Sequence, residues 1–336
     1  MSEGLTVIIA TCGRPDRLAA TLRSVAKSIA EAGGKHAVVV VDNGPNYGAA
    51  APAADFASAS NLDVTYRTSP PRDKSKALNT GIDAAETEWL AFTDDDTLPD
   101  TRWLTEGVRF ARSSGLRIFG GRIVPGQAPG TLPAWLRPGR SGRVPHGGVS
   151  VSYSPLNSNG VISESDPVPY GANIFVRRDV FEEHGKYDET LWKLCGKAAL
   201  GCEDCQFAVR VRNNGEKIGF CHEALVTHPF HGDRSSFGSY VKLAYYYGWR
   251  DPLVFYDPDR PAFEKYQLGR TIRLKMRALA DLCCGDIAGA AACVCEMAMC
   301  FGNVAGRLSP AYRKWTELQN RRKRSNARKL PEGKLH

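Results

Sequence analysis

The chain has 336 residues, a length that suits one large domain or two smaller ones and is too short for three. Hydrophobic residues make up 43% and charged residues 24%, which is ordinary for a globular protein with a sizeable core. The formal net charge of +8 favours an anionic partner, but eight basic residues and one acid lie between Arg313 and Lys329. The charge excess therefore belongs to a C-terminal tail, and the rest of the chain is close to neutral.

The N-terminus leads directly into an apolar run, without the basic region and cleavage site of a secretory signal. We therefore expect a cytoplasmic protein. The ten cysteines are irregularly spaced and several lie inside apolar runs, so we expect reduced, buried thiols.

The first part of the chain alternates apolar runs with a helical pattern. Residues 6–10 predict a buried strand, and Pro15 suits the first position of the helix that follows. Residues 37–41 predict a second strand ending at Asp42, and this strand–helix–strand order predicts a parallel sheet. The first turn lacks Gly-x-Gly-x-x-Gly, which argues against a dinucleotide-dependent dehydrogenase. The apolar face of the helix consists of Leu18, Leu22, Val25 and Ile29.

A helix over 49–59 and a strand over 62–67 are predicted next. The loop 72–82 is basic and enters another helix. Lysine and arginine beside a helix N-terminus suit a phosphate, although an ordinary solvated helix start has the same composition.

Three carboxylates, at 94–96, follow the apolar run 89–93 and precede Pro99, which we expect to end the strand. They therefore lie at the carboxyl end of a strand, where open α/β sheets bind ligands. Adjacent acids repel one another unless a positive group lies among them, and Mg²⁺ bound to a diphosphate would be such a group. The alternative is a solvated acidic turn that caps the next helix.

Beyond this turn, the pattern predicts a helix over 100–114 and a strand over 117–124. Residues 125–167 are rich in Gly, Pro and Ser, which predicts long loops and a flap over the site. A strand over 171–176 and a helix over 178–184 follow.

A second acidic pair, Glu203 and Asp204, opens a further predicted helix. The helix dipole alone favours acids there, so the pair indicates either a plain helix start or a catalytic carboxylate. His228 ends a strand predicted over 224–229 and is either a satisfied loop residue or a metal ligand.

The C-terminal part is predicted to be helical over 235–248 and again over 270–307. The apolar run 287–295 is too short to span a bilayer, so we expect it to pack on the body or to lie on a membrane surface. The basic tail would then pair with anionic lipid; otherwise it is a solvated, flexible end. Nucleic acid is not expected, because no aromatic residues interleave with the basic ones.

Taken in order, these motifs resemble those of the family-two glycosyltransferases, which are inverting enzymes with the GT-A fold. The resemblance covers residues 5–235. It implies an α/β protein with a Rossmann-like, mostly parallel sheet flanked by helices, and a C-terminal helical extension. The motifs are Val7–Thr11 with Arg14-Pro15, Val41-Asp42-Asn43, Lys76–Gly81, Thr93–Asp96, Gly171–Asn173, Cys202–Asp204 and His228.

The expected catalytic domain is 1–235, with a nucleotide-sugar half at 1–124 and an acceptor half at 125–235. A helical region at 236–310 and a basic, flexible tail at 311–336 follow.

The resemblance implies a role for each motif. Asp204 would be the general base, and Glu203 and Asn173 would bind the acceptor. Asp96 and His228 would hold a divalent cation, Mn²⁺ or Mg²⁺. The nucleotide sugar would be bound by Thr11, Arg14, Asp42, Lys76, Asn79, Asp94 and Asp95.

The implied reaction moves one sugar from a nucleoside-diphosphate sugar, with UDP favoured, to a hydroxyl of a glycan, lipid-linked or small-molecule acceptor. Processive relatives carry Gln-x-x-Arg-Trp, whereas Tyr247–Arg250 does not fit that pattern, so we expect a single addition. One alternative is a nucleotidyltransferase that makes sugar nucleotides, which would need a Gly-rich loop with Arg after the first strand. The other is a non-catalytic membrane-surface protein.

Overall fold

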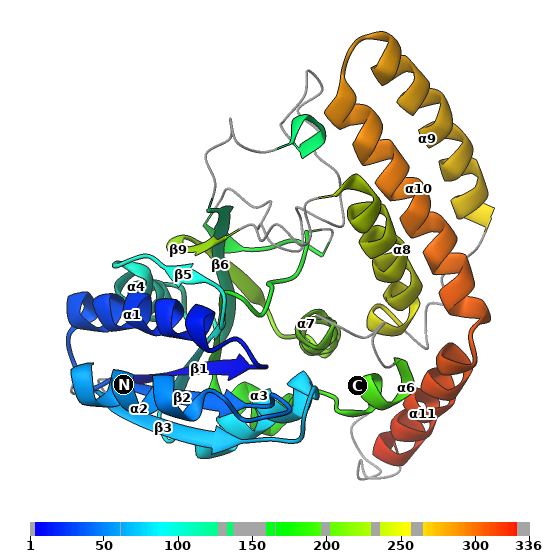
Figure 1. The fold of residues 1–336 in the computed structure, drawn as a ribbon. Helices are drawn as coiled ribbons and strands as arrows, with labels where there is room; N and C mark the ends of the chain where they lie inside the picture. Colours follow the sequence, from blue (N-terminus) through cyan, green and yellow to red (C-terminus); the bar gives the residue numbers. More distant parts are fainter. Residues whose placement is uncertain are drawn as a thin grey trace. The chain divides into compact units, whose positions relative to one another are not determined.

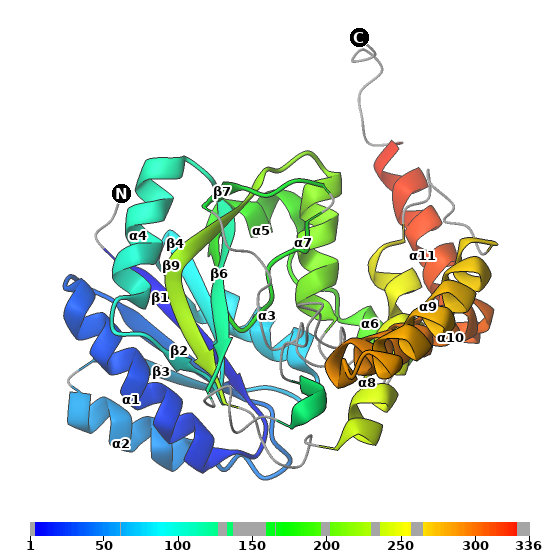
Figure 2. The same ribbon diagram turned by 90° about the horizontal axis from the view of Figure 1, so that it is seen from above.

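The computed structural model describes residues 4–60, 62–126, 133–136, 159–164, 166–195, 202–229, 236–256 and 265–327 (Figures 1 and 2). The chain divides into two compact units. Unit 1 contains Met1–Leu132, Ser150–Glu189 and Glu203–Gly232, and unit 2 contains Pro133–Val149, Thr190–Cys202 and Asp233–His336. The boundary predicted at residue 235 lies near the end of unit 1, but two inner segments of the predicted catalytic domain belong to unit 2.

Unit 1 is built on one mixed sheet, which has nine strands among the described residues. Their order is β3-β2-β1-β4-β8-β6-β9-β5, and β7 pairs with β9. Pairs β1–β2, β1–β4, β2–β3 and β6–β9 are parallel, and the other pairs are antiparallel. The strands are β1 (Leu5–Thr11), β2 (Ala37–Asp42), β3 (Asp63–Thr68), β4 (Trp89–Asp94), β5 (Leu98–Pro99), β6 (Ile118–Pro125), β7 (Gly160–Val161), β8 (Ile174–Arg177) and β9 (Ile218–His228).

Helices cover both faces of this sheet (Figure 2). Alternate residues of β1 face opposite sides, so Val7 and Ile9 pack with the first face and Ile8 lies against Gly81 on the second. Burial on both faces explains why these strands are continuous apolar runs. The first face carries α1 (Pro15–Ala32), α2 (Ala50–Ser60) and α4 (Trp103–Ser114), and the second carries α3 (Lys74–Ala84), α5 (Arg178–His184) and α7 (Glu203–Asn213).

The parallel strands bring their carboxyl ends to one edge of the sheet. Thr11, the last residue of β1, is in register with Asp42, the last residue of β2. Asp94, the last residue of β4, is in register with Ala10. Side chains far apart in the sequence therefore meet at this edge, where the candidate site lies.

Two strand predictions need correction. Pro99 does not exclude strand structure, because Leu98 and Pro99 form the short edge strand β5 against β9. Proline is tolerated on an edge, where its missing N–H breaks no ladder hydrogen bond. Strand β9 begins at Ile218 and not at 224, because polar residues in its first half hide the pattern.

Unit 2 is helical in its described part (Figure 1). Helix α10 packs on both α8 and α9, and it approaches α8 closely because three glycines line the crossing. A Cβ atom at Gly302 would collide with the carbonyl oxygen of Tyr245, and one at Gly306 with that of Trp249. The elements are a 3₁₀ turn (Ala134–Leu136), α6 (Thr190–Cys195), α8 (Phe237–Val254), α9 (Lys265–Cys283), α10 (Ile287–Leu308) and α11 (Pro310–Ala327).

The basic segment predicted to be flexible is helical from Pro310 to Ala327, and its Trp315 is only 1% exposed. The burial of this tryptophan provides a reason for the order, because an apolar side chain removed from water stabilises the helix that carries it. Residues 328–336 lie outside the described residues, as do most of those in the expected flap at 125–167.

Helix α10 also corrects the prediction that its apolar run is too short for a bilayer. The helix continues to Leu308, and its 22 residues are long and apolar enough to cross a membrane by length and composition. Half of the most apolar 18-residue stretch of α10 is buried within the protein. A buried helix in the core of a globular protein can have the same length and composition. Helix α10 is the one helix of this kind in the described segments.

The substitution Gly302→Ala should destabilise unit 2, because the added methyl group forces α8 and α10 apart. We expect a loss of about 1–3 kcal/mol in the free energy of unfolding, measured by urea denaturation. Gly238→Ala is the matched control, since a Cβ atom there meets nothing within 4 Å. Equal stability of the two variants would contradict the close helix crossing.

Candidate active site

The three carboxylates at the end of β4 have different surroundings. Asp95 is fully buried, accepts a hydrogen bond from the Thr11 hydroxyl (2.7 Å) and is ion-paired with Arg14. Burial raises the pKa of Asp95 to about 6, although Arg14 and Thr11 act in the opposite direction. Asp95 therefore anchors the acidic turn to β1 and α1, and is poorly placed to meet a ligand.

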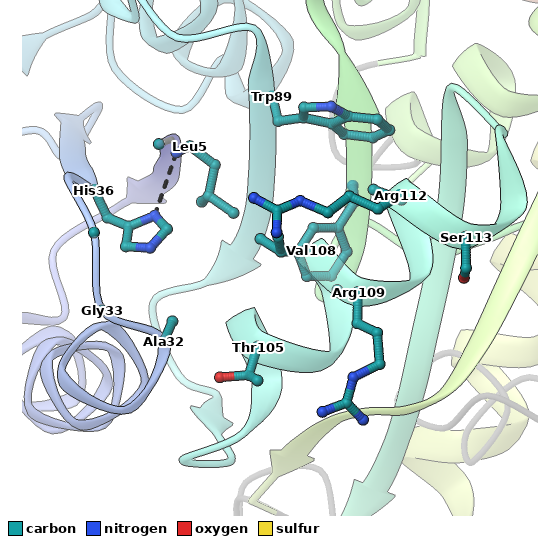
Figure 3. A pocket seen from close by; sticks show the side chains of 15 residues that line it. Leu5, Ala32, Gly33, His36, Trp89, Thr105, Val108, Arg109, Arg112 and Ser113 are labelled. Atoms are coloured by element: carbon teal, nitrogen blue, oxygen red, sulfur yellow. Dashed lines mark hydrogen bonds between the residues drawn. The ribbon is translucent and has the colours of Figure 1, made fainter. Parts of the chain in front are cut away.

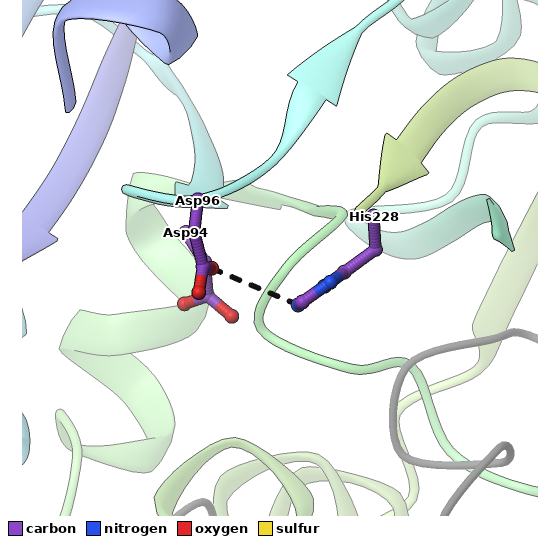
Figure 4. Close-up of side chains that lie close together, drawn as sticks. All are labelled: Asp94, Asp96 and His228. Carbon is purple, nitrogen blue, oxygen red and sulfur yellow. Dashed lines mark ion pairs between the residues drawn. The ribbon is translucent and has the colours of Figure 1, made fainter. Parts of the chain in front are cut away.

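Asp94, Asp96 and His228 form a group that can hold a metal ion (Figure 4). One candidate ligand atom from each lies within 4.8 Å of the others, and His228 Nε2 is 3.7 Å from Asp96 Oδ1. The strand end of β4 supplies the acids and the end of β9 supplies the imidazole. Two carboxylates and one imidazole suit Mn²⁺, and carboxylates also suit Mg²⁺, so these residues fit the expected cation.

Arginines of the first helix balance part of this negative charge. Arg14 is ion-paired with Asp96 as well as Asp95, and Arg17 Nη1 lies 3.6 Å from Asp96 Oδ2. Both arginines lie in the first turn of α1 or just before it. A guanidinium at a helix N-terminus is suited to a phosphate group, so this corner can accept an anion beside a cation.

Lys74 connects the acidic turn to the second acidic motif. Its Nζ lies 2.8 Å from Asp94 Oδ1 and 3.4 Å from Glu203 Oε1. Burial by itself would lower the pKa of Lys74, but Asp94, Glu203 and Asp204 raise it well above its ordinary value. Burial likewise raises the pKa of Asp94, but Lys74 outweighs that effect and leaves the pKa lowered. The ammonium group of Lys74 thus keeps Asp94 ionised.

Asp204, beside Glu203 at the start of α7, has its carboxylate fixed by two backbone donors. The amide of Gly171 donates to Oδ2 (2.6 Å) and that of Cys205 donates to Oδ1 (2.7 Å). A Cβ atom at position 171 would lie 3.1 Å from Oδ2, so glycine permits this approach. Because Lys74 is ion-paired with both Asp94 and Glu203, the residue next to Asp204, both acidic motifs lie in one region of unit 1.

Asn173 and Asn79, predicted to bind the acceptor and the nucleotide sugar, are engaged within the fold. Asn173 is fully buried, and its amide bonds the carbonyls of Arg122 and Ala224 and the indole N–H of Trp103. Asn79 holds the backbone N–H and carbonyl of Tyr187. Both N–H groups of each amide thus join segments of the fold, and the predicted roles in binding stay predictions.

Asp42 and Lys76 are both predicted to bind the nucleotide sugar, but Asp42 is buried and Lys76 is exposed. Asp42 is fully buried, and its oxygens accept from the amides of Gly44 and Ala49 (2.8 Å each). It shapes the loop after β2, so contact with a nucleotide would require this loop to move. Lys76 is exposed, whereas Lys74, in the same helix turn, is ion-paired with Asp94. Lys74 lies in the same basic loop of the sequence, but no local feature of the sequence distinguishes it from Lys76.

A cavity of about 750 Å³ lies at the other end of the strands, between α1 and α4 (Figure 3). Leu5 and Trp89, the first residues of β1 and β4, line it, whereas the acids lie at the carboxyl ends of those strands. Arg112 and Arg109 of α4 also line it. None of the predicted site residues is among its lining, so it is separate from the acidic site.

Two solved structures share the fold. Staphylococcus aureus TarS aligns with a TM-score of 0.51 at 15% identity, over 82% of this chain and 43% of that one. Mannosyltransferase PcManGT from Pyrobaculum calidifontis, in complex with GDP-Man and Mn²⁺, aligns with a TM-score of 0.52 at 17% identity, over 94% of this chain and 84% of that one. Together with the observed sheet and C-terminal helices, they confirm the GT-A-like fold class.

Two curated proteins are similar in sequence. Glycosyltransferase AglE of Haloferax volcanii is 27% identical over 200 residues, 58% of this chain and 57% of AglE. The match thus spans little more than half the length of that relative. Succinoglycan biosynthesis protein ExoM of Rhizobium meliloti is 30% identical over 237 residues, 70% of each chain.

The family model of glycosyl transferase family 2 matches residues 6–185, more than half of the chain. On these grounds the chain belongs to glycosyl transferase family 2, and thus to the glycosyltransferases.

Proposed function

We propose that the protein transfers a single sugar from a nucleoside-diphosphate sugar to an acceptor hydroxyl, with inversion at the anomeric carbon and with a divalent cation. One observation carries the proposal: Lys74 joins Asp94 to Glu203, and so Asp204, the proposed base, lies near the group that could hold a cation. A displacement needs a leaving group held on one side of the sugar and an activated nucleophile on the other. These two acidic motifs are suited to the two tasks.

On the donor side, Asp94, Asp96 and His228 would hold the cation. When bound, the cation would neutralise charge that develops on the departing diphosphate. Arg14 and Arg17 would contribute further positive charge at this corner, and Asp95 would hold Arg14 in place. The complex of PcManGT with GDP-Man and Mn²⁺ and that of TarS with UDP-GlcNAc support this type of donor.

On the acceptor side, Asp204 would remove the proton of the attacking hydroxyl. The two backbone N–H groups that hold its carboxylate leave lone pairs available and fix its direction. A hydroxyl becomes an effective nucleophile as a positioned carboxylate takes its proton in the transition state. Attack on the face opposite the diphosphate inverts the anomeric centre. Glu203 would remain ion-paired with Lys74 and would help to balance the charge around Asp204.

The geometry leaves the sugar open, and a UDP-sugar is the donor that we favour. The acceptor class is a glycan, a lipid-linked sugar or a small hydroxyl compound, as in polysaccharide or glycoconjugate synthesis. The description of ExoM as a succinoglycan biosynthesis protein is consistent with this class.

The substitution Asp204→Asn should lower kcat by about a hundredfold or more, because the amide cannot accept the hydroxyl proton. A panel of nucleotide sugars and acceptors first identifies the substrates, with products separated by chromatography. Glycoside and nucleoside diphosphate are the expected products; sugar nucleotide and pyrophosphate would instead indicate a nucleotidyltransferase.

Asp55→Asn, an exposed acid of α2, is the control for Asp204→Asn and should retain full activity. Donor affinity is measured for both variants by calorimetry. Near-full transfer by Asp204→Asn with normal donor binding would exclude Asp204 as the base.

The substitutions Asp96→Asn and His228→Gln should each weaken Mn²⁺-dependent binding of UDP by about tenfold or more, since the first removes the negative charge of a ligand and the second removes the imidazole nitrogen. Calorimetry with and without Mn²⁺ measures the effect. His184→Gln is the matched control: Glu183, His184 and Glu216 have similar spacing, but Arg117 already neutralises both glutamates. UDP binding that is independent of Mn²⁺ in the unaltered protein would refute the metal assignment.

The substitution Lys74→Met should abolish most transfer, because Asp94 and Glu203 then lose the cation that holds them together. Lys74→Arg should restore a measurable part, since charge is what the position requires. Lys76→Met, two residues away and exposed, should have little effect. The rate of sugar transfer is measured by steady-state kinetics for the three variants. An equal loss of activity in Lys74→Met and Lys76→Met would contradict the role assigned to Lys74.

A further inference from the structure

Helix α9 has two apolar faces, and only one of them is covered by the described part of the chain. Leu274 and Ala278 are buried in a small cluster with Cys293, Met297 and Cys300 of α10. Four other large apolar side chains of α9 are between 57% and 66% exposed: Ile272, Met276, Leu279 and Leu282. We call these four residues the outer stripe.

The outer stripe lies on the side of α9 that faces away from α10. At about 100° per residue, Ile272, Met276 and Leu279 fall within roughly 60° of one another, and Leu274 lies about 200° from Ile272. Figure 1 shows α9 running along α10. An exposed stripe of this kind marks an interaction surface, because large apolar side chains gain free energy when they leave water.

Cations lie beside the outer stripe and, at Lys275, within it. Helix α9 carries Arg270, Arg273, Lys275 and Arg277 against a single acid, Asp281, among the residues whose side chains are described. Arg273, Lys275 and Arg277 are exposed, and among the described residues an ion pair is recorded only for Arg270, with Glu296. An apolar stripe beside unneutralised cations has the composition of a helix that lies in the surface of an anionic bilayer.

We propose that α9 docks on an anionic membrane surface, with the outer stripe inserted among the lipids and Arg273, Lys275 and Arg277 at the level of the head groups. Charge complementarity selects this occupant. A second copy of the chain would bring two sets of cations together, whereas anionic head groups neutralise them.

Nearby helices of unit 2 provide further suitable residues. Helix α10 exposes Phe301, Val304 and Leu308 at helical spacing, and α11 carries six basic residues between Arg313 and Arg324. Contact at the surface also suits α10 better than spanning does, because Gly302 and Gly306 pack it against α8 as part of unit 2. The inference concerns unit 2 alone and holds whether or not the proposed sugar transfer is correct.

The test is flotation of the full-length protein with vesicles of phosphatidylcholine, alone or mixed with phosphatidylglycerol, at low and high salt. We expect binding to the mixed vesicles, weak binding to pure phosphatidylcholine, and a decrease at high salt. The double substitution Met276→Gln and Leu279→Gln should weaken binding about tenfold or more. Arg273→Gln and Lys275→Gln should each cost about fivefold, and only at low salt.

Val161→Gln is the matched control, because Val161 is 59% exposed but belongs to β7 of unit 1. It should bind like the unaltered protein. Binding that is unchanged in the α9 variants, equal on both vesicle types, or absent throughout would overturn the proposal. Sedimentation velocity without lipid provides a further decision: a dimer that the Met276→Gln and Leu279→Gln pair dissociates would assign the outer stripe to a second copy.

Discussion

The ammonium group of Lys74 between Asp94 and Glu203 is the interaction on which the candidate site depends. Asp94 ends a strand and Glu203 begins a helix much later in the chain, and each is at least partly removed from water. Without a cation between them, the two carboxylates would repel each other and one would take up a proton. With Lys74 present, the pKa of Asp94 stays low, although burial still raises the pKa of Glu203, and the second acidic motif remains beside the first. The site is therefore held together by charge as much as by backbone geometry.

The sheet edge provides the platform for this pairing, but not every polar group there is available to a ligand. Asp42 uses both oxygens to shape the loop after β2, and burial together with Asp42 raises the pKa of Tyr66, which donates to it, to about 12. Asp95 is held by Thr11 and Arg14. These residues fix the backbone around the acidic turn. Asp94, Asp96 and His228 are the group whose spacing suits a cation, because their side chains converge from two different strand ends.

The two units carry different kinds of surface. Unit 1 contains every residue of the candidate site, on the edge of a sheet whose core is apolar on both faces. Unit 2 is organised by close helix packing at Gly248, Gly302 and Gly306, and it presents the outer stripe of α9 with its cations. The outer stripe is an exposed apolar surface of the kind that marks an interaction site. Chemistry and the proposed membrane contact thus belong to separate parts of the chain.

The sequence alone determined the parallel strands, the apolar face of α1 and the two acidic motifs, because each depends on residues close together in the chain. The sequence pattern could not reveal β5, since proline is rare in strands. It could not reveal α11 either, because the burial of Trp315 is a feature of the tertiary structure. Only the tertiary structure decided between Lys74 and Lys76, which point about 200° apart on one helix. It also assigned Asn79 and Asn173 to the scaffold, because the groups that their amides bond come from distant segments. Periodicity specifies which side of an element is buried, whereas the partner of a polar side chain is decided by how the elements pack.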